Sequence, residues 1–248
     1  MDDHEFSVFA AEAAGARLLE VRRQGLEGKA LKDAGDAAAQ ELLARLLAEH
    51  RPDDHVLSEE ERDDKSRLDA DRVWIIDPLD GTREFSEPPR DDWAVHVALW
   101  ERSAGDLTAG AVAQPALGET YDTGRPAEVP ARTSSRPRIA VSRTRPPVFV
   151  QALAEEIDAE LVPMGSAGVK VMSVVRDVAD AYVHAGGQYQ WDNAAPVVVA
   201  RAAGLHCSRV DGSPLVYNED DTSLPDLVVC RPELAEQILE FVRRHGTD

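Results

Sequence analysis

One nine-residue stretch most constrains the structure that this chain can adopt, because it requires a buried strand to end in a tight, acidic loop. Its sequence is Trp74-Ile-Ile-Asp-Pro-Leu-Asp-Gly-Thr82. The apolar run at its start is typical of a buried strand, Pro78 is expected to end ladder pairing, and Gly81 permits a sharp turn. Asp77 and Asp80 would then share one rigid loop and repel each other unless a hard cation lies between them. The stretch predicts a divalent-metal site, with an Asx-turn that happens to carry two acids as the alternative.

Hydrophobic periodicity predicts the elements of the N-terminal half. Helical rhythms cover residues 5–23 and 36–49, and a short strand starting at His55 runs into an acidic loop. Further strands are expected at 73–76, 93–100 and 109–112. The charged segment 62–72 is expected to be an exposed excursion.

The C-terminal half has a different pattern. Strands are expected at 138–141, 161–163, 181–184 and 227–230, and helices at 148–157, 167–178, 192–203 and 232–245. This alternation is typical of an α/β unit. The Pro-, Arg-, Ser- and Thr-rich segment 124–137 is the expected crossing between two sub-domains, residues 1–135 and 136–248.

Composition limits the partners and the location of the protein. A net charge of −19 offers no basic stripe for a nucleic-acid polymer. No apolar run approaches the roughly 20 residues that cross a bilayer, and the start Met1-Asp-Asp-His-Glu5 lacks the basic residues of a signal peptide, so a cytoplasmic protein without a membrane partner is expected. The two cysteines, Cys207 and Cys230, are predicted to be reduced core residues, and His96 and His184 to be structural.

Three acidic clusters lie far apart in the sequence, each where a strand or loop gives way to a new element. They are Glu59-Glu60, the pair Asp77 and Asp80, and Asp192. Alone, Glu59-Glu60 could be a solvated run, and Asp192 could only cap a helix. Together they supply enough oxygen ligands for two or three small divalent ions.

The type of ligand indicates the metal and its chemistry. All candidates are carboxylates or carbonyls, without paired His or Cys, which favours Mg²⁺. Because Mg²⁺ usually completes its coordination on phosphate oxygens, the expected chemistry is phosphoryl transfer or hydrolysis. No P-loop motif is present, which disfavours a nucleoside-triphosphate motor.

In order and spacing, these three clusters resemble the inositol monophosphatase family, the lithium-sensitive, Mg²⁺-dependent phosphatases. The most specific part is Asp77-Pro-Leu-Asp-Gly-Thr82, and the resemblance covers most of the chain. It implies a sugar-phosphatase fold of layered helices and sheets (αβαβα), with the site between two sub-domains. It also implies a homodimer.

The resemblance also implies roles for individual residues. Metal ligands would be Glu59, Asp77, the Leu79 carbonyl, Asp80 and Asp192, with Glu60 as a second acid near the ions. The catalytic set would be Glu59, Asp36 and Thr82, in which the Thr82 hydroxyl orients the attacking water and Asp36 pairs with it. Backbone amides of Gly81 and Thr82 would meet the transferred phosphate. One departure is local: the family usually has Thr three residues before this acid and Ala just before it, where this chain has Asp33 and Gly35.

Two segments bear on the substrate. Inositol-specific members carry a Glu shortly before the Trp-Asp pair, whereas residues 184–190 contain no acid. The segment Val141-Ser-Arg-Thr144 is similar to one in the CysQ-type branch, which removes the 3′-phosphate of 3′-phosphoadenosine 5′-phosphate (PAP). The Ser142 hydroxyl and the Arg143 fork suit a second phosphate, with an ordinary surface loop as the alternative.

Other residues are expected to border the substrate. Gly165 and Ser166 match a position that lines the pocket in the family, and Asp192 and Trp191 are expected beside it. Lys170 could present its ammonium to an anionic ligand, or be a solvated helix residue.

The predicted activity is hydrolysis of PAP to AMP and phosphate, in sulfur assimilation, with 3′-phosphoadenosine 5′-phosphosulfate (PAPS) as a further substrate. The alternatives within the same class are inositol monophosphate and fructose 1,6-bisphosphate phosphatases. A non-catalytic metal- or nucleotide-binding module is the alternative from another class.

Overall fold

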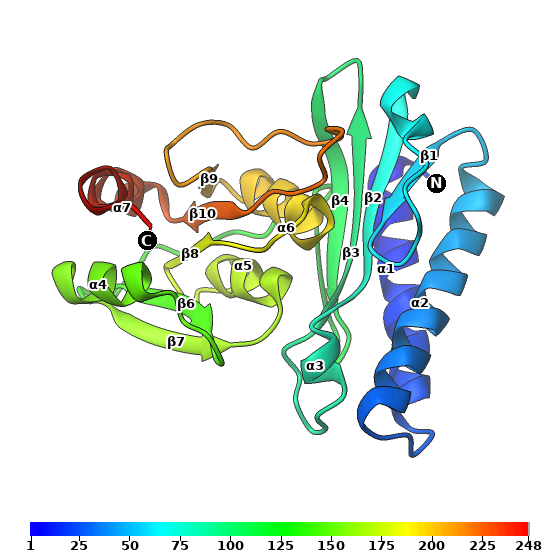
Figure 1. Ribbon diagram of the computed structural model, residues 1–248, viewed down its shortest axis with the longest axis horizontal. Coiled ribbons are helices and arrows are strands. Elements are labelled where there is room, and N and C mark those ends of the chain that lie inside the picture. The colour runs from blue at the N-terminus through cyan, green and yellow to red at the C-terminus, as the bar shows by residue number, and fades with distance from the viewer. Residues whose placement is uncertain (248) are drawn as a thin grey trace.

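The computed structural model describes residues 1–247 and stacks helices and sheets in alternating layers (Figure 1). The outermost layer is formed by α1 (Asp3–Arg22) and α2 (Gly28–His50), which cover the first sheet. Between the two sheets lie α5 (Ala167–Val175) and α6 (Gln190–Ala202), and the far face of the second sheet carries α4 (Val148–Glu156) and α7 (Pro232–His245). This arrangement confirms the predicted αβαβα layering.

The first sheet contains β1 (His55–Ser58), β2 (Arg72–Asp80), β3 (Ala94–Glu101), β4 (Asp106–Gln114) and β5 (Glu119–Asp122), in that spatial order. Only β1 and β2 are parallel, and the other neighbours are antiparallel. The 3₁₀ helix η1 (Ser66–Asp69) and the short helix α3 (Thr82–Phe85) flank β2 in the sequence. β5 was not predicted, because it is short and mostly polar.

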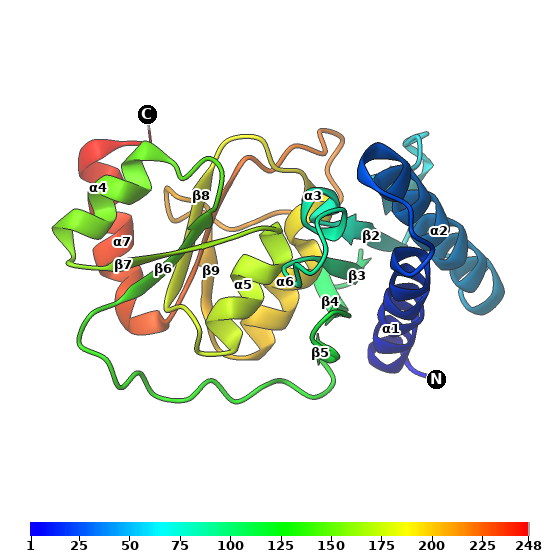
Figure 2. The same cartoon turned by 90° about the horizontal axis from the view of Figure 1, so that it is seen from below.

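The second sheet has the order β7-β6-β8-β10-β9. Its strands are β6 (Arg138–Ser142), β7 (Glu160–Met164), β8 (Ala181–Ala185), β9 (His206–Ser208) and β10 (Asp226–Cys230). β6 is parallel to β7 and β8, whereas β10 is antiparallel to both of its neighbours. The chain passes from the first sheet to the second through a long connection, residues 123–137, that runs along the outside (Figure 2). The proposed sub-domain boundary at residue 135 lies within it.

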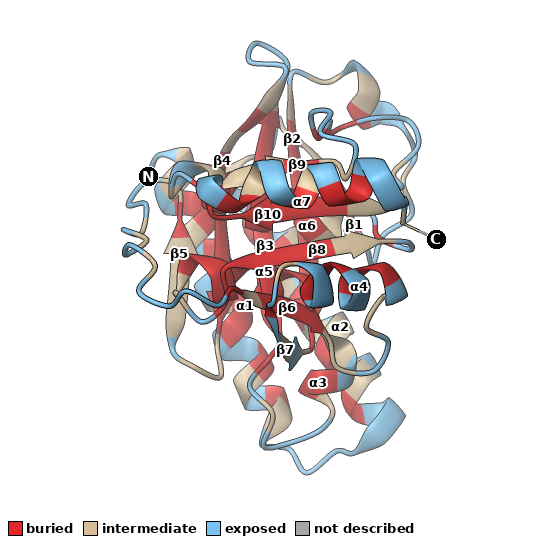
Figure 3. Ribbon diagram, turned by 90° about the vertical axis from the view of Figure 1, so that its left-hand side faces the viewer, coloured by how far each residue is buried: buried red, intermediate tan, exposed pale blue. Residues whose placement is uncertain are grey.

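Burial follows the layers (Figure 3). The central strands and the helices between the sheets are largely buried, while the edge strand β7 has no buried residue and the outer helices bury only one face. Trp74 and Trp93 pack in the core between the outer helices and the first sheet, and Trp100 lies in the core between the sheets. No helix of residues 1–247 combines the length and the apolar character that crossing a membrane would require.

The course of β2 at its end differs from the prediction. Pairing with β3 is interrupted after Asp77, but it resumes at Asp80, opposite Ala94, so Pro78 interrupts the strand without ending it. In a regular strand, side chains three positions apart point to opposite faces. The irregularity removes this alternation and allows both aspartates to face the same side.

Two other segments also differ. α2 begins at Gly28, so Asp36 lies inside the helix instead of at its start. The segment 62–72 is mostly exposed as predicted, but Arg67 within it is only 1% exposed. The buried guanidinium of Arg67 therefore anchors the segment 62–72 to the rest of the fold.

Candidate active site

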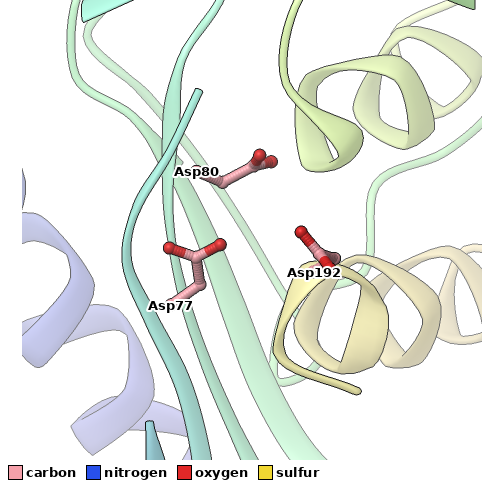
Figure 4. A group of neighbouring side chains, drawn as sticks. All are labelled: Asp77, Asp80 and Asp192. Atoms are coloured by element: carbon pink, nitrogen blue, oxygen red, sulfur yellow. The ribbon is translucent and has the colours of Figure 1, made fainter. Parts of the chain in front are cut away.

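Three carboxylates predicted as metal ligands converge at the end of β2 (Figure 4). Oxygen atoms of Asp77, Asp80 and Asp192 lie within 4.8 Å of one another. Asp77 and Asp80 come from the irregular end of β2, and Asp192 comes from the first turn of α6. Asp77 is 1% exposed and Asp80 is 7% exposed, so most of this charge is withdrawn from water.

The position of Asp192 fits both of the roles considered for it. α6 begins at Gln190, and the Tyr189 amide donates to Asp192 Oδ2 at 2.6 Å, so the carboxylate caps the helix. The same side chain still points toward Asp77 and Asp80. Capping therefore fixes the orientation of a potential ligand.

Burial, and then the proximity of the other acids, raises the pKa values of most of these carboxylates. Burial, followed by the charges of Glu59, Asp80 and Asp192, holds the pKa of Asp77 well above its usual value. Burial and then Asp80 raise the pKa of Asp192 to about 6. Glu59 lies at the surface, yet desolvation by its surroundings and the charges of Asp192 and Asp80 raise its pKa to about 7. A divalent cation would relieve this repulsion, so the oxygen-only cluster fits the metal that was predicted.

Asp80 is the exception among these acids. Burial alone would raise its pKa, but His96 and hydrogen bonds from Ser166 and Gly168 lower it to about 2. His96 Nε2 lies 3.2 Å from Asp80 Oδ2, and the Gly168 amide donates to the same oxygen at 2.6 Å. The Ala167 amide donates to Oδ1 at 3.1 Å. The start of α5 therefore holds Asp80 ionised, and His96 supports the site directly.

The predicted water-orienting pair is also assembled. The Thr82 hydroxyl donates to the Leu79 carbonyl oxygen at 3.2 Å, and Thr82 lies close enough to Asp36 to influence the pKa of its carboxyl. Burial, followed by the charges of Glu60 and Asp33, raises the pKa of Asp36 to about 7. Glu60 thus acts on the site through its charge.

The structure explains the departure from the family pattern just before Asp36. A Cβ atom at Gly35 would lie 2.6 Å from Phe85 Cε1 and 3.0 Å from Leu79 Cδ2. An alanine would therefore clash with side chains in and just after the segment 77–82, which we call the metal-site loop. Gly35 lets α2 approach that loop closely enough for Asp36 to reach Thr82.

A hollow of about 290 Å³ begins at the metal-site loop, and we call it the cationic hollow. It is lined by all the predicted substrate residues except Asp192, namely Gly81, Thr82, Ser142, Arg143, Gly165 and Ser166. Arg83, Glu84 and Arg145 also line it and were not predicted. Arg83 and Glu84 directly follow the motif at residues 77–82, and Arg145 directly follows the segment 141–144, so this adjacency was the signal that could have identified them.

Two basic residues of this hollow have partners within the protein. Arg143 Nε donates to Glu84 and Arg143 Nη2 to Glu87, both at 2.7 Å. Lys170 Nζ donates to the Ser166 carbonyl at 2.6 Å, and its side chain is 7% exposed. The alternative of a solvated helix residue was therefore wrong for Lys170.

The chemistry available here belongs to one class of enzyme. Buried carboxylate oxygens beside a hydroxyl and a further acid suit the transfer of a phosphoryl group to water, where hard cations would neutralise the phosphate oxygens. Fold and site thus define a phosphatase. The chain belongs to the inositol monophosphatase family, whose model matches residues 5–247.

Individual relatives agree with this assignment. The chain is 52% identical over 234 residues to a Mycobacterium bovis protein named 3′-phosphoadenosine 5′-phosphate phosphatase, covering 91% of this chain and 88% of that protein. It is 31% identical over 204 residues to 3′(2′),5′-bisphosphate nucleotidase CysQ of Escherichia coli K12, covering 77% of this chain and 81% of that one. These matches confirm the predicted family and the predicted phosphatase class.

Solved structures agree on the fold. Inositol monophosphatase II from Staphylococcus aureus superposes with a TM-score of 0.81 at 22% sequence identity, covering 99% of this chain and 98% of that chain. At this identity, the likeness shows the fold alone.

Proposed function

We propose that the chain is a Mg²⁺-dependent phosphatase that hydrolyses the 3′-phosphate of PAP to give AMP and phosphate. The observation that carries the proposal is the cationic hollow, which adjoins the metal-site loop and offers room and charge for a second phosphate. The names of the two relatives described above support the same substrate. PAPS is proposed as a further substrate. We also propose that the protein is a homodimer and that it acts in sulfur assimilation in the cytoplasm.

The proposed ligands for two or three Mg²⁺ ions are Glu59, Asp77, the Leu79 carbonyl, Asp80 and Asp192. The fit of the three clustered aspartates is supported by their mutual distances and by the absence of nitrogen or sulfur ligands among them. When bound, Mg²⁺ would neutralise phosphate charge and make the attacking water more acidic.

The chain's own residues would orient and deprotonate that water. The Thr82 hydroxyl, whose proton is donated to the Leu79 carbonyl, can accept a hydrogen bond from the water and fix its position. Asp36, with a pKa of about 7, is suited to exchange a proton near neutral pH. Backbone amides of Gly81 and Thr82 are proposed to hold the transferred phosphate.

An aromatic pair beside Asp192 suits a nucleobase. The rings of Tyr189 and Trp191 are stacked, with centroids 4.9 Å apart and planes inclined by 12°. Tyr189 is 45% exposed, so part of this residue is accessible to a ligand. We propose that the adenine ring of PAP packs against this pair, because a base gains stacking energy that an inositol ring cannot.

Initial rates on PAP, inositol 1-phosphate and fructose 1,6-bisphosphate test the substrate. We expect kcat/KM for PAP to exceed that for either alternative by about 100-fold, because a site built for a second phosphate leaves its cations unpaired with a monophosphate. Greater efficiency on inositol 1-phosphate would overturn the proposal. Absence of phosphate release from all three with Mg²⁺ would favour the non-catalytic module.

Arg67 links the loop that carries Glu59 to the segment that precedes Asp192. Its Nη2 donates to Asp63 at 2.8 Å, and its Nη1 donates to Asn218 Oδ1 at 2.7 Å. The Asn218 amide in turn donates to the side chain of Gln190, two residues before Asp192, at 2.7 Å. This buried chain of hydrogen bonds fixes two parts of the proposed ligand set relative to each other.

We expect Arg67→Met to raise the Mg²⁺ concentration that gives half-maximal activity by about tenfold, the range typical when support behind a ligand is lost. Arg67→Lys should fall between this variant and the wild type, because lysine keeps the charge but cannot make the forked contacts. Mg²⁺ titrations of the initial rate give the measurement, and thermal unfolding reports whether each variant is folded.

The matched control for Arg67→Met is Arg62→Met in the same loop. Arg62 is exposed, and its side chain has no hydrogen bond or ion pair to any residue from 1 to 247. Its Mg²⁺ dependence should match the wild type. An unchanged Mg²⁺ dependence in a folded Arg67→Met protein would contradict the positioning role.

A further inference from the structure

The cationic hollow is unusual for this protein because of its charge. The chain carries a net charge of −19, yet the charged residues that line the hollow are Arg83, Arg143, Arg145, Lys170 and a single acid, Glu84. Such a local excess of positive charge in an acidic protein favours an anionic ligand.

The basic residues of the hollow differ in whether their side chains already make hydrogen bonds or ion pairs within the protein. Arg143 is held by Glu84 and Glu87, and Lys170 is turned toward backbone carbonyls. Arg83 and Arg145 are exposed, and within residues 1–247 neither side chain makes a hydrogen bond or an ion pair. These two guanidinium groups are therefore available to a ligand without breaking an existing contact.

We propose that the hollow is a subsite for a second phosphate of the substrate, and that Arg83 and Arg145 are its main cations. The proposal rests on the proposed function and identifies the residues that distinguish a bisphosphorylated substrate from a monophosphate. A planar guanidinium can bind a terminal phosphate with two parallel hydrogen bonds. Arg143 then lines the subsite in a fixed orientation. Among residues 1–247, its Nε and Nη2 have side-chain partners, and only Nη1 lacks one.

The location of the hollow supports this assignment. Its lining includes Gly81 and Thr82, which also belong to the loop that carries Asp77 and Asp80. A ligand whose reacting phosphate lies at this loop can therefore place a second phosphate of the same sugar in the hollow. The ligand class is a ribose bearing two phosphates, or a phosphate and a phosphosulfate.

The test compares PAP with 3′-AMP, which differs from it only by lacking the 5′-phosphate. We measure kcat/KM for both substrates in wild type, Arg83→Ala, Arg145→Ala and the double variant. In each single variant the ratio of kcat/KM for PAP to that for 3′-AMP should fall about tenfold, as expected for loss of a charge-assisted contact. The fall should arise mainly from a higher KM for PAP.

The matched control is Arg45→Ala, since Arg45 is an exposed arginine of α2 outside the hollow. It should leave the ratio unchanged. A ratio that stays at the wild-type value in the double variant would overturn the subsite, as would a wild-type enzyme that does not distinguish the two substrates. A wild type that hydrolyses inositol 1-phosphate but not PAP would instead overturn the proposed function.

Discussion

Asp80→Asn should reduce phosphate release by about 10³-fold or more, equivalent to roughly 4 kcal/mol of transition-state stabilisation. The substitution removes one negative charge from the carboxylate cluster. It also turns an acceptor into a partial donor, although the amides of Ala167 and Gly168 and the Ser166 hydroxyl all donate to Asp80. Loss of a proposed metal ligand and a clash between donors therefore act together.

Initial rates over a range of Mg²⁺ concentrations measure this effect, with circular dichroism to verify that the variant is folded. The control is Asp122→Asn, which alters another buried aspartate that accepts bonds from two backbone amides, those of Gly124 and Arg125. It should retain activity within about twofold, since Asp122 lies at the end of β5 and is not one of the clustered acids. Full activity in Asp80→Asn would refute the metal assignment.

The second large effect concerns stability. We expect Asp180→Ala to lower the free energy of unfolding by about 3 kcal/mol, because it removes one side of a buried ion-pair network. Asp180 is fully buried, and it accepts bonds from Arg138 and from Arg231, which is itself 4% exposed. Asp177 remains as a partner of both arginines and limits the loss.

Urea denaturation measures this change. Asp71→Ala is the control, since Asp71 is 87% exposed in its pair with Arg102 and should contribute less than about 0.5 kcal/mol. Burial alone would raise the pKa of Asp180, but the hydrogen bonds from Arg138 and Arg231 outweigh burial and lower it. A lowered pKa stabilises the folded state at neutral pH, and this contribution is lost as the pH falls through the folded-state pKa. The difference between wild type and Asp180→Ala should therefore shrink in acid, and equal stability at pH 7 would contradict the network's role.

Local sequence patterns predicted most of the long elements and the carboxylate cluster. The strand before Asp77 and the helix that carries Asp192 have clear periodicity, and the acids stand at their ends. β5 and β9 were missed because short, polar strands have little periodic signal, and both are held mainly by their neighbours in the sheet.

What could not be predicted depends on contacts between residues far apart in the sequence. Arg67 lies in a charged segment that resembles an exposed loop, and its buried contact with Asn218 follows only from the packing of the two halves. That Arg83 and Arg145 are free to bind a ligand could not be predicted either. In the structure the acids Glu84 and Glu87 pair with Arg143 and not with these two arginines. Pairing of charges is decided by the tertiary structure.

The irregular end of β2 and the start of α6 come from opposite sides of the 123–137 connection, so the three clustered aspartates exist as a set only when both halves are folded together. An ion that binds this set recognises the native state and not the unfolded chain, which links its concentration to the folding equilibrium. For the proposed Mg²⁺, a higher ion concentration should therefore raise the free energy of unfolding as well as the rate of turnover.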